Sequence, residues 1–467
     1  MPIHFRSPAA RALAASLLLI PLPAWAQEKA RPPLTILPSE EDWSSFRDPA
    51  NRRGFLDRIK YLPLGGGGYL TLGGEVRPFY ERFTNEVFGA VPGGTDAWLL
   101  QRYMLHASLH AHRRVRIFGQ LKSTLADGRD GGPRPPDEDR LDLNQLFVDL
   151  RVGAIPERGP APATLRVGRQ ELSFGSGRMV TVREGPNTRY PWDGVRATIH
   201  AAGWRVDGWG TYLVETDRGV FDDSPVEGEK FWGAHGTRPL GVSSVDAYYL
   251  GTDKAVMRVY QGAAPETRHT LGARLWSARR PVDFDLEVAG QLGTFGAGAI
   301  RAWTVAGSLG HTWQELRVKP RLGIAVGLAS GDRDSADVAL QTFDPPAPRG
   351  TYFGHATPLG PGNIMGGAVQ LGFAPLRDVS VGVESYFFWR HTLDDGIYSV
   401  VGGPIRGVRG SRARFVAAQP QGEVHWQANR HTRFSISAAR AFAGTFLEET
   451  GPAEDVDYFS TYLTLKF

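Results

Sequence analysis

The sequence predicts an all-β protein: a closed antiparallel transmembrane β-barrel of 18 strands, preceded by a cleaved signal peptide. Three observations predict this fold. Apolar and polar residues alternate in short stretches from Tyr69 to the last residue, no linker divides these stretches into domains, and the longest apolar run near the start is too short to cross a membrane as a helix.

The first 26 residues have the features of a secretory signal peptide. Arg6 and Arg11 give a basic start, and Leu13 to Ile20 form a short apolar run. Ala24-Trp25-Ala26 supplies the small-x-small pattern of a cleavage site, so we expect cleavage before Gln27.

Three parts follow from this division of the chain. Residues 1–26 are the signal peptide, residues 27–68 are expected to form an N-terminal periplasmic segment leading into the barrel, and residues 69–467 form one outer-membrane barrel. Gly65 to Gly68 reads as a flexible approach to the first strand, because no Lys-Ser/Thr follows it as in a phosphate-binding loop.

The alternation is clear around residue 288. Leu286, Val288 and Leu292 share one parity, whereas Glu287 and Gln291 share the other. A strand with this pattern presents one apolar face and one polar face. Similar stretches occupy residues 70–80, 317–328 and 379–390, and charge recurs on one face in each of them.

A soluble β-sandwich also alternates, so the membrane barrel needs further support. The apolar faces often end in aromatic residues, as the interfacial girdles of outer-membrane barrels do; examples are Trp303, Trp389, Trp426 and Tyr212. The last strand ends in Phe467 and resembles the C-terminal strand of outer-membrane proteins, which the barrel assembly machinery recognises.

About 17 strands can be placed directly, and bacterial single-chain barrels have an even number. One more strand is expected between Val245 and Tyr260, which gives 18. A barrel of this width encloses an aqueous lumen rather than a packed interior.

Composition excludes several other classes of protein. With no cysteine, the chain has no disulfide and no thiolate metal site. The net charge is only +4 and both signs are scattered along the chain, so a nucleic-acid-binding patch is not expected. No cofactor-binding motif is found.

The polar faces of the strands carry arginines, which suit the passage of an anionic solute because a guanidinium pairs bidentately with a carboxylate and stays protonated. Interspersed acidic residues would weaken any single site, so that a solute can also leave. The arginines expected on the lumen face are Arg77, Arg102, Arg116, Arg166, Arg196, Arg268, Arg274, Arg321 and Arg390. The carboxylates expected beside them are Glu75, Asp149, Asp285, Glu287 and Glu384.

Two residues and one segment complete the expected solute path. Arg169 has the wrong parity relative to Arg166, so it reaches the lumen only at a strand end or a bulge; Asp193 is placed on the same path. Residues 175–193 alternate poorly and carry Arg178, Arg183 and Arg189 among glycines and a proline. We interpret this segment as a loop that folds into the pore as a constriction.

At this point the chain resembles the alginate export family of outer-membrane barrels. The resemblance runs through most of the mature chain and rests on motifs that occur in this order: Glu41-Asp42-Trp43, Arg47-Asp48-Pro49, Lys60-Tyr61-Leu62-Pro63-Leu64, the stretches 72–77, 166–175 and 183–187, Asp193-Gly194, and the stretches 219–223, 266–272 and 329–332.

The resemblance implies an outer-membrane channel, not an enzyme, that passes an anionic polysaccharide such as alginate or a similar polyuronate. It also implies contact with outer-membrane lipid, assembly through Phe467 and periplasmic export partners.

Alternatives remain at several points. Each arginine can brace the wall through a carboxylate instead of contacting a solute, and the barrel can be an uptake porin for small acidic or aromatic solutes. Ser108 between His106 and His110 suggests a hydrolase, but no nucleophile elbow is present. Asp332, Asp334 and Asp337 read as a turn, because a calcium loop would also need its glycine and closing glutamate.

Overall fold

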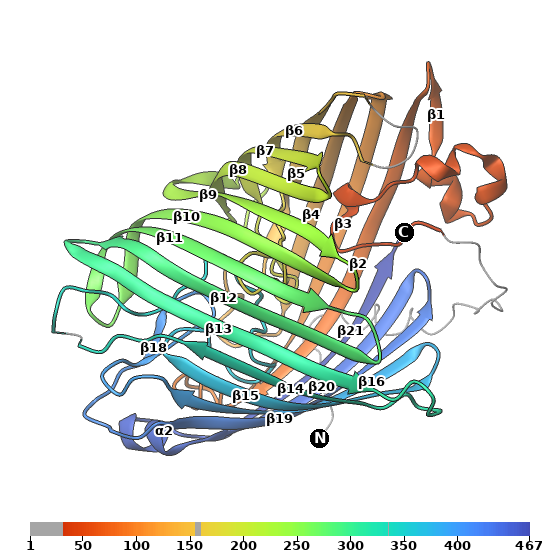
Figure 1. Cartoon of the computed structure of the whole chain (residues 1–467). Coiled ribbons are helices and arrows are strands. Elements are labelled where there is room, and N and C mark those ends of the chain that lie inside the picture. The colour runs from red at the N-terminus through yellow and green to blue at the C-terminus, as the bar shows by residue number, and fades with distance from the viewer. Residues whose placement is uncertain (1–30, 155–159, 335) are drawn as a thin grey trace.

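The computed structural model describes residues 31–154, 160–334 and 336–467, so the expected signal peptide lies outside the described residues. The chain forms a closed antiparallel barrel of 18 strands, β2 to β16 and β19 to β21, each of which pairs with its neighbours in sequence. The first and last of these close the ring, since Glu75 of β2 lies opposite Lys466 of β21 (Figure 1). The predicted fold class and strand number are confirmed.

The first nine strands of the barrel are β2 (Gly68–Thr84), β3 (Thr95–His112), β4 (Val115–Asp127), β5 (Asp139–Val152), β6 (Ala163–Gln170), β7 (Trp192–Ala201), β8 (Trp204–Glu215), β9 (Ser224–Leu240) and β10 (Ser243–Val259). The remaining strands are β11 (Gly262–Ser277), β12 (Val282–Phe295), β13 (Gly298–Thr312), β14 (Arg321–Ala329), β15 (Ile364–Leu376), β16 (Val379–Arg390), β19 (Phe415–Asn429), β20 (Thr432–Ala443) and β21 (Val456–Lys466). Outside the ring lie β1 (Leu62–Gly65), β17 (Ile397–Tyr398), β18 (Pro404–Arg406), α2 (Thr445–Thr450) and the 3-10 helices η1 (Pro38–Glu40), η2 (Ser44–Arg47), η3 (Pro49–Asn51) and η4 (Leu56–Lys60).

Strand parity sorts the side chains as predicted. On β12, Leu286 is 54% exposed and points outward, whereas Glu287 is 3% exposed and points inward. Val288 opposite Val305 of β13 continues the outward face. The outward face is apolar and exposed because it faces lipid, while the polar face is enclosed by the barrel. One strand detail differs from prediction: β14 begins only at Arg321, because residues 313–320 form a turn that ends in Pro320. The extra strand expected between residues 245 and 260 is confirmed as β10.

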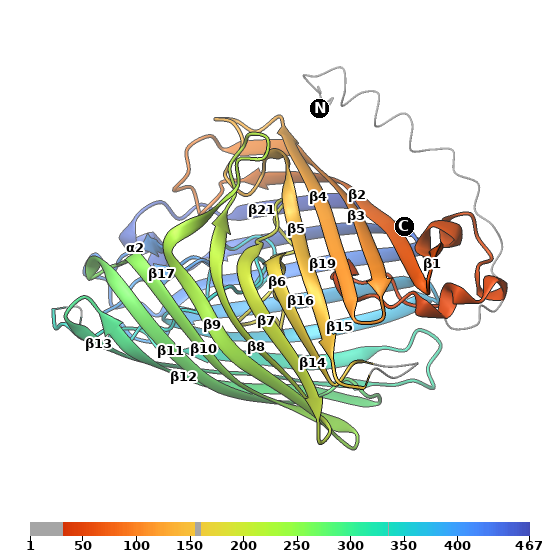
Figure 2. The ribbon, with the colours of Figure 1, turned by 90° about the horizontal axis from the view of Figure 1, so that it is seen from above.

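The two ends of the barrel differ. At one end, the short-turn end, tight connections such as residues 113–114, 202–203 and 377–378 join the strands. At the other, the long-loop end, most connections are long; these are residues 85–94, 128–138, 171–191, 216–223, 330–363, 391–414 and 444–455. Figure 2 shows the N-terminal 3-10 helices and the C-terminus at one end and α2 at the opposite end.

The N-terminal segment packs at the short-turn end. Trp43, Phe46, Tyr61 and Tyr69 form a small apolar cluster there. β1 forms a hairpin with the start of β2, so the glycines after residue 64 make its turn. At the same end Phe467 exchanges two backbone hydrogen bonds with Gly74, of 2.9 and 3.0 Å. No helix among the described residues is long and apolar enough to cross a membrane.

Candidate functional site

The arginines predicted on the lumen face all point into the barrel, but most of them are bound to a carboxylate of the wall. Arg116 and Arg166 share Asp149, with 2.8 Å between Arg166 Nε and Asp149 Oδ1. Arg196 lies 2.9 Å from Asp207. A buried arginine that is fully paired holds neighbouring strands in register and offers little free charge. These residues therefore brace the wall, as the alternative interpretation proposed.

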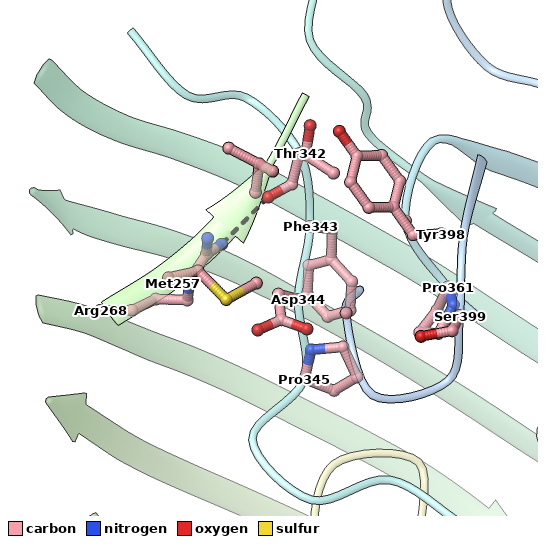
Figure 3. A pocket seen from close by; sticks show the side chains of 12 residues that line it. Met257, Arg268, Thr342, Phe343, Asp344, Pro345, Pro361, Tyr398 and Ser399 are labelled. Carbon is pink, nitrogen blue, oxygen red and sulfur yellow. Dashed lines mark hydrogen bonds between the residues drawn. The ribbon is translucent and has the colours of Figure 1, made fainter. Parts of the chain in front are cut away.

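Two other predicted arginines anchor loops. Arg268 of β11 pairs with Glu266 at 2.8 Å and donates a hydrogen bond to the carbonyl of Thr342, at 3.0 Å. Figure 3 shows this contact, with Phe343, Asp344 and Pro345 packed beside it. Arg390 donates to the carbonyls of Ala413 and Ser411 and holds the loop 391–414. Both side chains are 2% exposed or less, so a solute does not reach them.

The loop of residues 171–191 crosses the lumen, in agreement with the predicted constriction. At one wall Arg77 of β2 donates to the carbonyls of Glu184 and Pro186, at 2.8 and 3.0 Å. Asn187 adds three hydrogen bonds to backbone carbonyls, including that of Asp137 at 2.8 Å. At the far wall, Arg178 lies 2.8 Å from Asp285 and 2.9 Å from Glu287, both on β12. The segment is thus fixed on opposite sides of the barrel.

The near end of this loop is an ionic cluster. The Glu184 carboxylate bonds to Arg102 of β3 and to Arg189 of its own loop, and Arg102 also pairs with Glu75 at 2.6 Å. Burial raises the pKa of Glu184, but Arg102 and Arg189 outweigh it and hold that pKa below its usual value. Burial lowers the pKa of Arg189, and Glu184 and its acidic neighbours more than reverse this. The cluster is therefore ionised and locks the loop.

The N-terminal segment enters the lumen from the short-turn end, which the sequence did not predict. Arg189 donates to the carbonyl of Ile36 at 3.0 Å, and Arg116 donates to that of Ser39 at 2.7 Å. Glu40 lies between Arg196 of β7 and Arg205 of β8. Residues 36–40 therefore reach from the short-turn mouth to the constriction loop.

An open cavity remains against the wall of β13 to β16, with a volume of about 290 Å³. The wall strands face it with small side chains, including Thr304, Ala306, Ser308, Ala325 and Ala368, and two loops face it from the other side. Small residues on one side and loop residues on the other leave room for a solute beside the constriction.

The charged side chains that line this cavity are Arg178, Arg274, Arg349 and Asp285. The further carboxylates that neutralise the first two arginines, Asp246 and Glu287, are buried behind them and do not line it. The cavity surface therefore presents three guanidinium groups against one carboxylate, and of these three Arg349 is the one without a carboxylate partner among the described residues.

Arg349 has no carboxylate partner among the residues that the structure describes. Its side chain is exposed, its backbone N–H donates to the carbonyl of Gly177 at 3.1 Å, and its guanidinium lies 5.8 Å from the ring centroid of Tyr352. Sequence reasoning missed it, because Arg349 lies in a loop without periodicity. The three prolines and the alanine before it, residues 345–348, do not indicate which way its side chain points.

Arg169 and Asp193 lie at the ends of their strands, at the rim of the predicted path. They lie opposite each other on β6 and β7 and pair at 2.9 Å. Arg169 also lies opposite Leu146, which is 48% exposed on the lipid face, and residues directly opposite share one face. The loop 216–223 covers the pair at the rim. The backbone parity of Arg169 therefore holds, but at this strand end its guanidinium lies 3.6 Å from Asp142, which is opposite the lumen-face residue Lys122.

Arg183 also differs from expectation. It pairs with the hydroxyl of Tyr190 in its own loop and is buried. Of the three constriction arginines, only Arg178 lines the cavity.

Three other groups of residues are candidates for a catalytic or metal-binding site, from the sequence or from the fold. Ser108 Oγ lies 3.2 Å from His110 Nε2 inside the barrel. Asp332 is buried, and its backbone N–H donates to Asp395 at 2.9 Å, so this stretch joins two loops. Asp139, Asp142 and Asp223 lie close enough to suggest a cation site. The ammonium of Lys122 lies 2.8 Å from the first and 2.7 Å from the third, so a protein cation already occupies this position.

Comparison with known proteins agrees with this architecture. The family model described as alginate export matches residues 68–460. A search of curated proteins gives no match.

Solved structures of Pseudomonas aeruginosa porins share the fold. OpdO is 12% identical, with a TM-score of 0.57 over 85% of this chain and 97% of that one. OccK11 (OpdR) is 14% identical, with a TM-score of 0.53 over 85% and 96%. OccK2 (OpdF), solved in complex with glucuronate, is 13% identical, with a TM-score of 0.54 over 85% and 98%.

Proposed function

Because the chain belongs to the alginate export family and is an outer-membrane channel, we propose that it passes acidic saccharides, an anionic polysaccharide such as alginate or a similar polyuronate, through its arginine-lined lumen. The observation that carries the proposal is the cationic surface of the cavity, above all Arg349, whose guanidinium is free to meet a carboxylate. Arg178 and Arg274 lie on the same cavity and share Asp285.

This arrangement suits transfer rather than tight binding. Arg178 and Arg274 share the carboxylate of Asp285, so either guanidinium can exchange that partner for a carboxylate of the solute. A solute carboxylate held by Arg349 would therefore meet weaker sites on either side. Conduction requires sites that a solute can leave as easily as it binds.

The size of the cavity favours a second candidate, an uptake porin for small acidic or aromatic solutes. About 290 Å³ is near the lower limit of small-ligand pockets, roughly 300 Å³, and holds a single sugar rather than a length of polymer. Passage of a polymer would require the constriction loop or residues 36–40 to move. Tyr352 and Tyr386, which also line the cavity, would suit aromatic solutes.

The charge at the short-turn end supports an anionic solute. In outer-membrane barrels the short turns face the periplasm, so we assign the short-turn end and residues 27–68 to that side. The basic residues in the described turns at this end are Arg113, Arg114, Arg279, Arg280, Arg317, Lys319, Arg377 and Arg430, and the acidic residues in those turns are Glu315 and Asp378. A basic rim raises the local concentration of anions and their rate of capture, while net flux still follows the concentration gradient.

Other partners follow from the same proposal. The apolar outward face contacts outer-membrane lipid, Phe467 is the residue that the assembly machinery would read, and periplasmic export partners would meet the chain at the short-turn end.

Conductance of the purified protein in planar bilayers tests the proposal. We expect anion selectivity, and partial block by glucuronate and by oligouronates but not by glucose, which has the same ring without the carboxylate. Block by glucuronate with no block by any oligomer would favour the second candidate. Cation selectivity without block by either acid would rule out both.

A further inference from the structure

Glu40 occupies a position that a carboxylate of a solute would suit. Its Oε1 lies 3.3 Å from Arg196 Nη1, and its Oε2 lies 3.2 Å from Arg205 Nη2. The carbonyl of the preceding residue, Ser39, accepts a hydrogen bond from Arg116 at 2.7 Å. Three arginines from three strands thus hold two residues of the N-terminal segment.

The charges around Glu40 balance only while it is present. Asp207 pairs with both arginines as well, at 2.9 Å from Arg196 and 3.0 Å from Arg205. Two cations therefore face two carboxylates, and the wall alone, without Glu40, would keep one positive charge in excess. Burial raises the pKa of Glu40, but Arg196 and Arg205 outweigh it and hold the pKa below its usual value, so Glu40 is ionised at neutral pH.

The site is open to solutes from the short-turn end. Glu40, Arg205 and Asp207 line a hollow of about 610 Å³ that extends from the turn at residues 201–203 to residues 173–175 of the constriction loop. The Arg205 side chain is 40% exposed and that of Glu40 is 28% exposed, so both can be reached, whereas Arg196 at 5% lies just behind them.

We propose that Arg196 and Arg205 form a carboxylate-binding site for uronates at the short-turn mouth, and that Glu40 is a tethered competitor which the solute displaces. This inference rests on the proposed passage of acidic saccharides and adds to it the first binding site and its regulation. Displacement of Glu40 also frees residues 36–40 from the lumen, so binding of the solute and widening of the path are coupled. The segment is continuous with the barrel through β1 and β2, and its other contacts near residues 36–40 are hydrogen bonds from Arg116, Arg189 and Lys466 that withdrawal would break.

The first test compares Glu40→Gln with the matched control Asp42→Asn in planar bilayers, with glucuronate added to both compartments. Asp42 lies on the same segment, and the structure gives its side chain one hydrogen bond, to the backbone N–H of Ser44. If Glu40 occupies the site about nine-tenths of the time, its loss lowers the half-blocking concentration about tenfold. The control should match the wild type. Equal block in Glu40→Gln and the wild type would overturn the inference alone, whereas no block in any protein would overturn the proposed function with it.

The second test detects the displacement itself. The chain has no cysteine, so Ser39→Cys introduces a single thiol at a position that is 2% exposed. Glucuronate should accelerate its labelling by a water-soluble maleimide about tenfold under the same occupancy, and glucose should leave the rate unchanged. A labelling rate that glucuronate does not change, in a protein that it blocks, would show that the segment stays in place and would overturn the inference.

Discussion

Replacement of Arg349 by glutamine should weaken the interaction of the pore with acidic solutes without disturbing the fold. The side chain is exposed on the cavity and has no carboxylate partner among the described residues, so its loss leaves no buried charge uncompensated. The same change at Arg178 would expose Asp285 and Glu287 to each other and disturb the loop as well. Arg349→Gln is therefore the cleaner test of the cationic surface.

The size of the effect follows from Coulomb's law. A carboxylate about 4 Å from a guanidinium gains about 1 kcal/mol in water and about 4 kcal/mol at an effective dielectric constant of 20. The cavity of about 290 Å³ is open and partly lined by charged side chains, so an effective dielectric constant between these limits applies and we expect about 1 to 2 kcal/mol. This corresponds to a rise of about five- to thirtyfold in the half-blocking concentration of glucuronate.

Single-channel recording in planar bilayers gives this concentration directly. The matched control is Arg333→Gln, which removes the same charge from an exposed position of the same loop, outside the residues that line the cavity. Charges more than about 10 Å apart are screened at 0.1 M salt, so the control should stay within about twofold of the wild type. Equal block in Arg349→Gln and the control would refute the assignment of the cavity as the solute path.

Three further predictions follow from the same geometry. Ala325→Phe should lower conductance, because residue 325 lines the cavity with a small side chain, whereas Ile324→Phe at the neighbouring lipid-facing position, which does not line the cavity, should leave conductance unchanged in the same recordings. Arg102→Ala removes the cation that joins Glu75 to Glu184 and leaves Arg189 as their shared partner, so it should cost about 3 kcal/mol, loosen the constriction loop and raise conductance; a lower transition temperature in heat-modified gel migration would report the loss. Burial and Asp395 raise the pKa of Asp332 from 3.8 to about 6, so ionisation of Asp332 destabilises the joined loops, and their stability should fall as pH rises from about 4 through 6 and stay low above it. Asp332→Asn should therefore slow proteolysis of loop 330–363 relative to the wild type at pH 7.5 and not at pH 4, and equal protection at both pH values would contradict this.

The faces of the strands could be predicted because a strand of a membrane barrel obeys a single local rule. Each residue of β12 between Leu286 and Gln291 faces lipid or lumen according to its parity, and both environments strongly prefer one class of side chain. Arg169 marks the limit of this rule: its backbone parity is outward, yet at the strand end its guanidinium lies 3.6 Å from Asp142 on the lumen face.

The partners of the arginines could not be predicted in the same way. Arg102 and Glu184 lie 82 residues apart in sequence, and Arg178 and Asp285 lie 107 apart, so their pairing depends on how a loop crosses the closed barrel. Parity shows that a charge faces inward, but not whether it is neutralised there. This is why so many predicted pore arginines brace the wall.

The elements without periodicity were the least accessible to sequence reasoning. The glycines and Pro186 indicated that residues 175–193 form a loop, and Gly175 and Gly177 take positive φ angles where that loop turns inside the barrel. Nothing comparable marked residues 36–40 as a lumen element or Arg349 as a cavity residue. Their positions follow from contacts with Arg116, Arg189 and Gly177 that form only when the ring has closed.

The reversal potential of the purified, refolded protein in a planar bilayer under a KCl gradient tests the central claim most directly. If the accessible charges of the lumen are mainly guanidinium groups, chloride should pass in preference to potassium. The reversal potential should then lie on the chloride side, and it should lie closer to the chloride equilibrium potential in the wild type than in Arg349→Gln. A reversal potential on the potassium side, the same in the wild type and in Arg349→Gln, would contradict it.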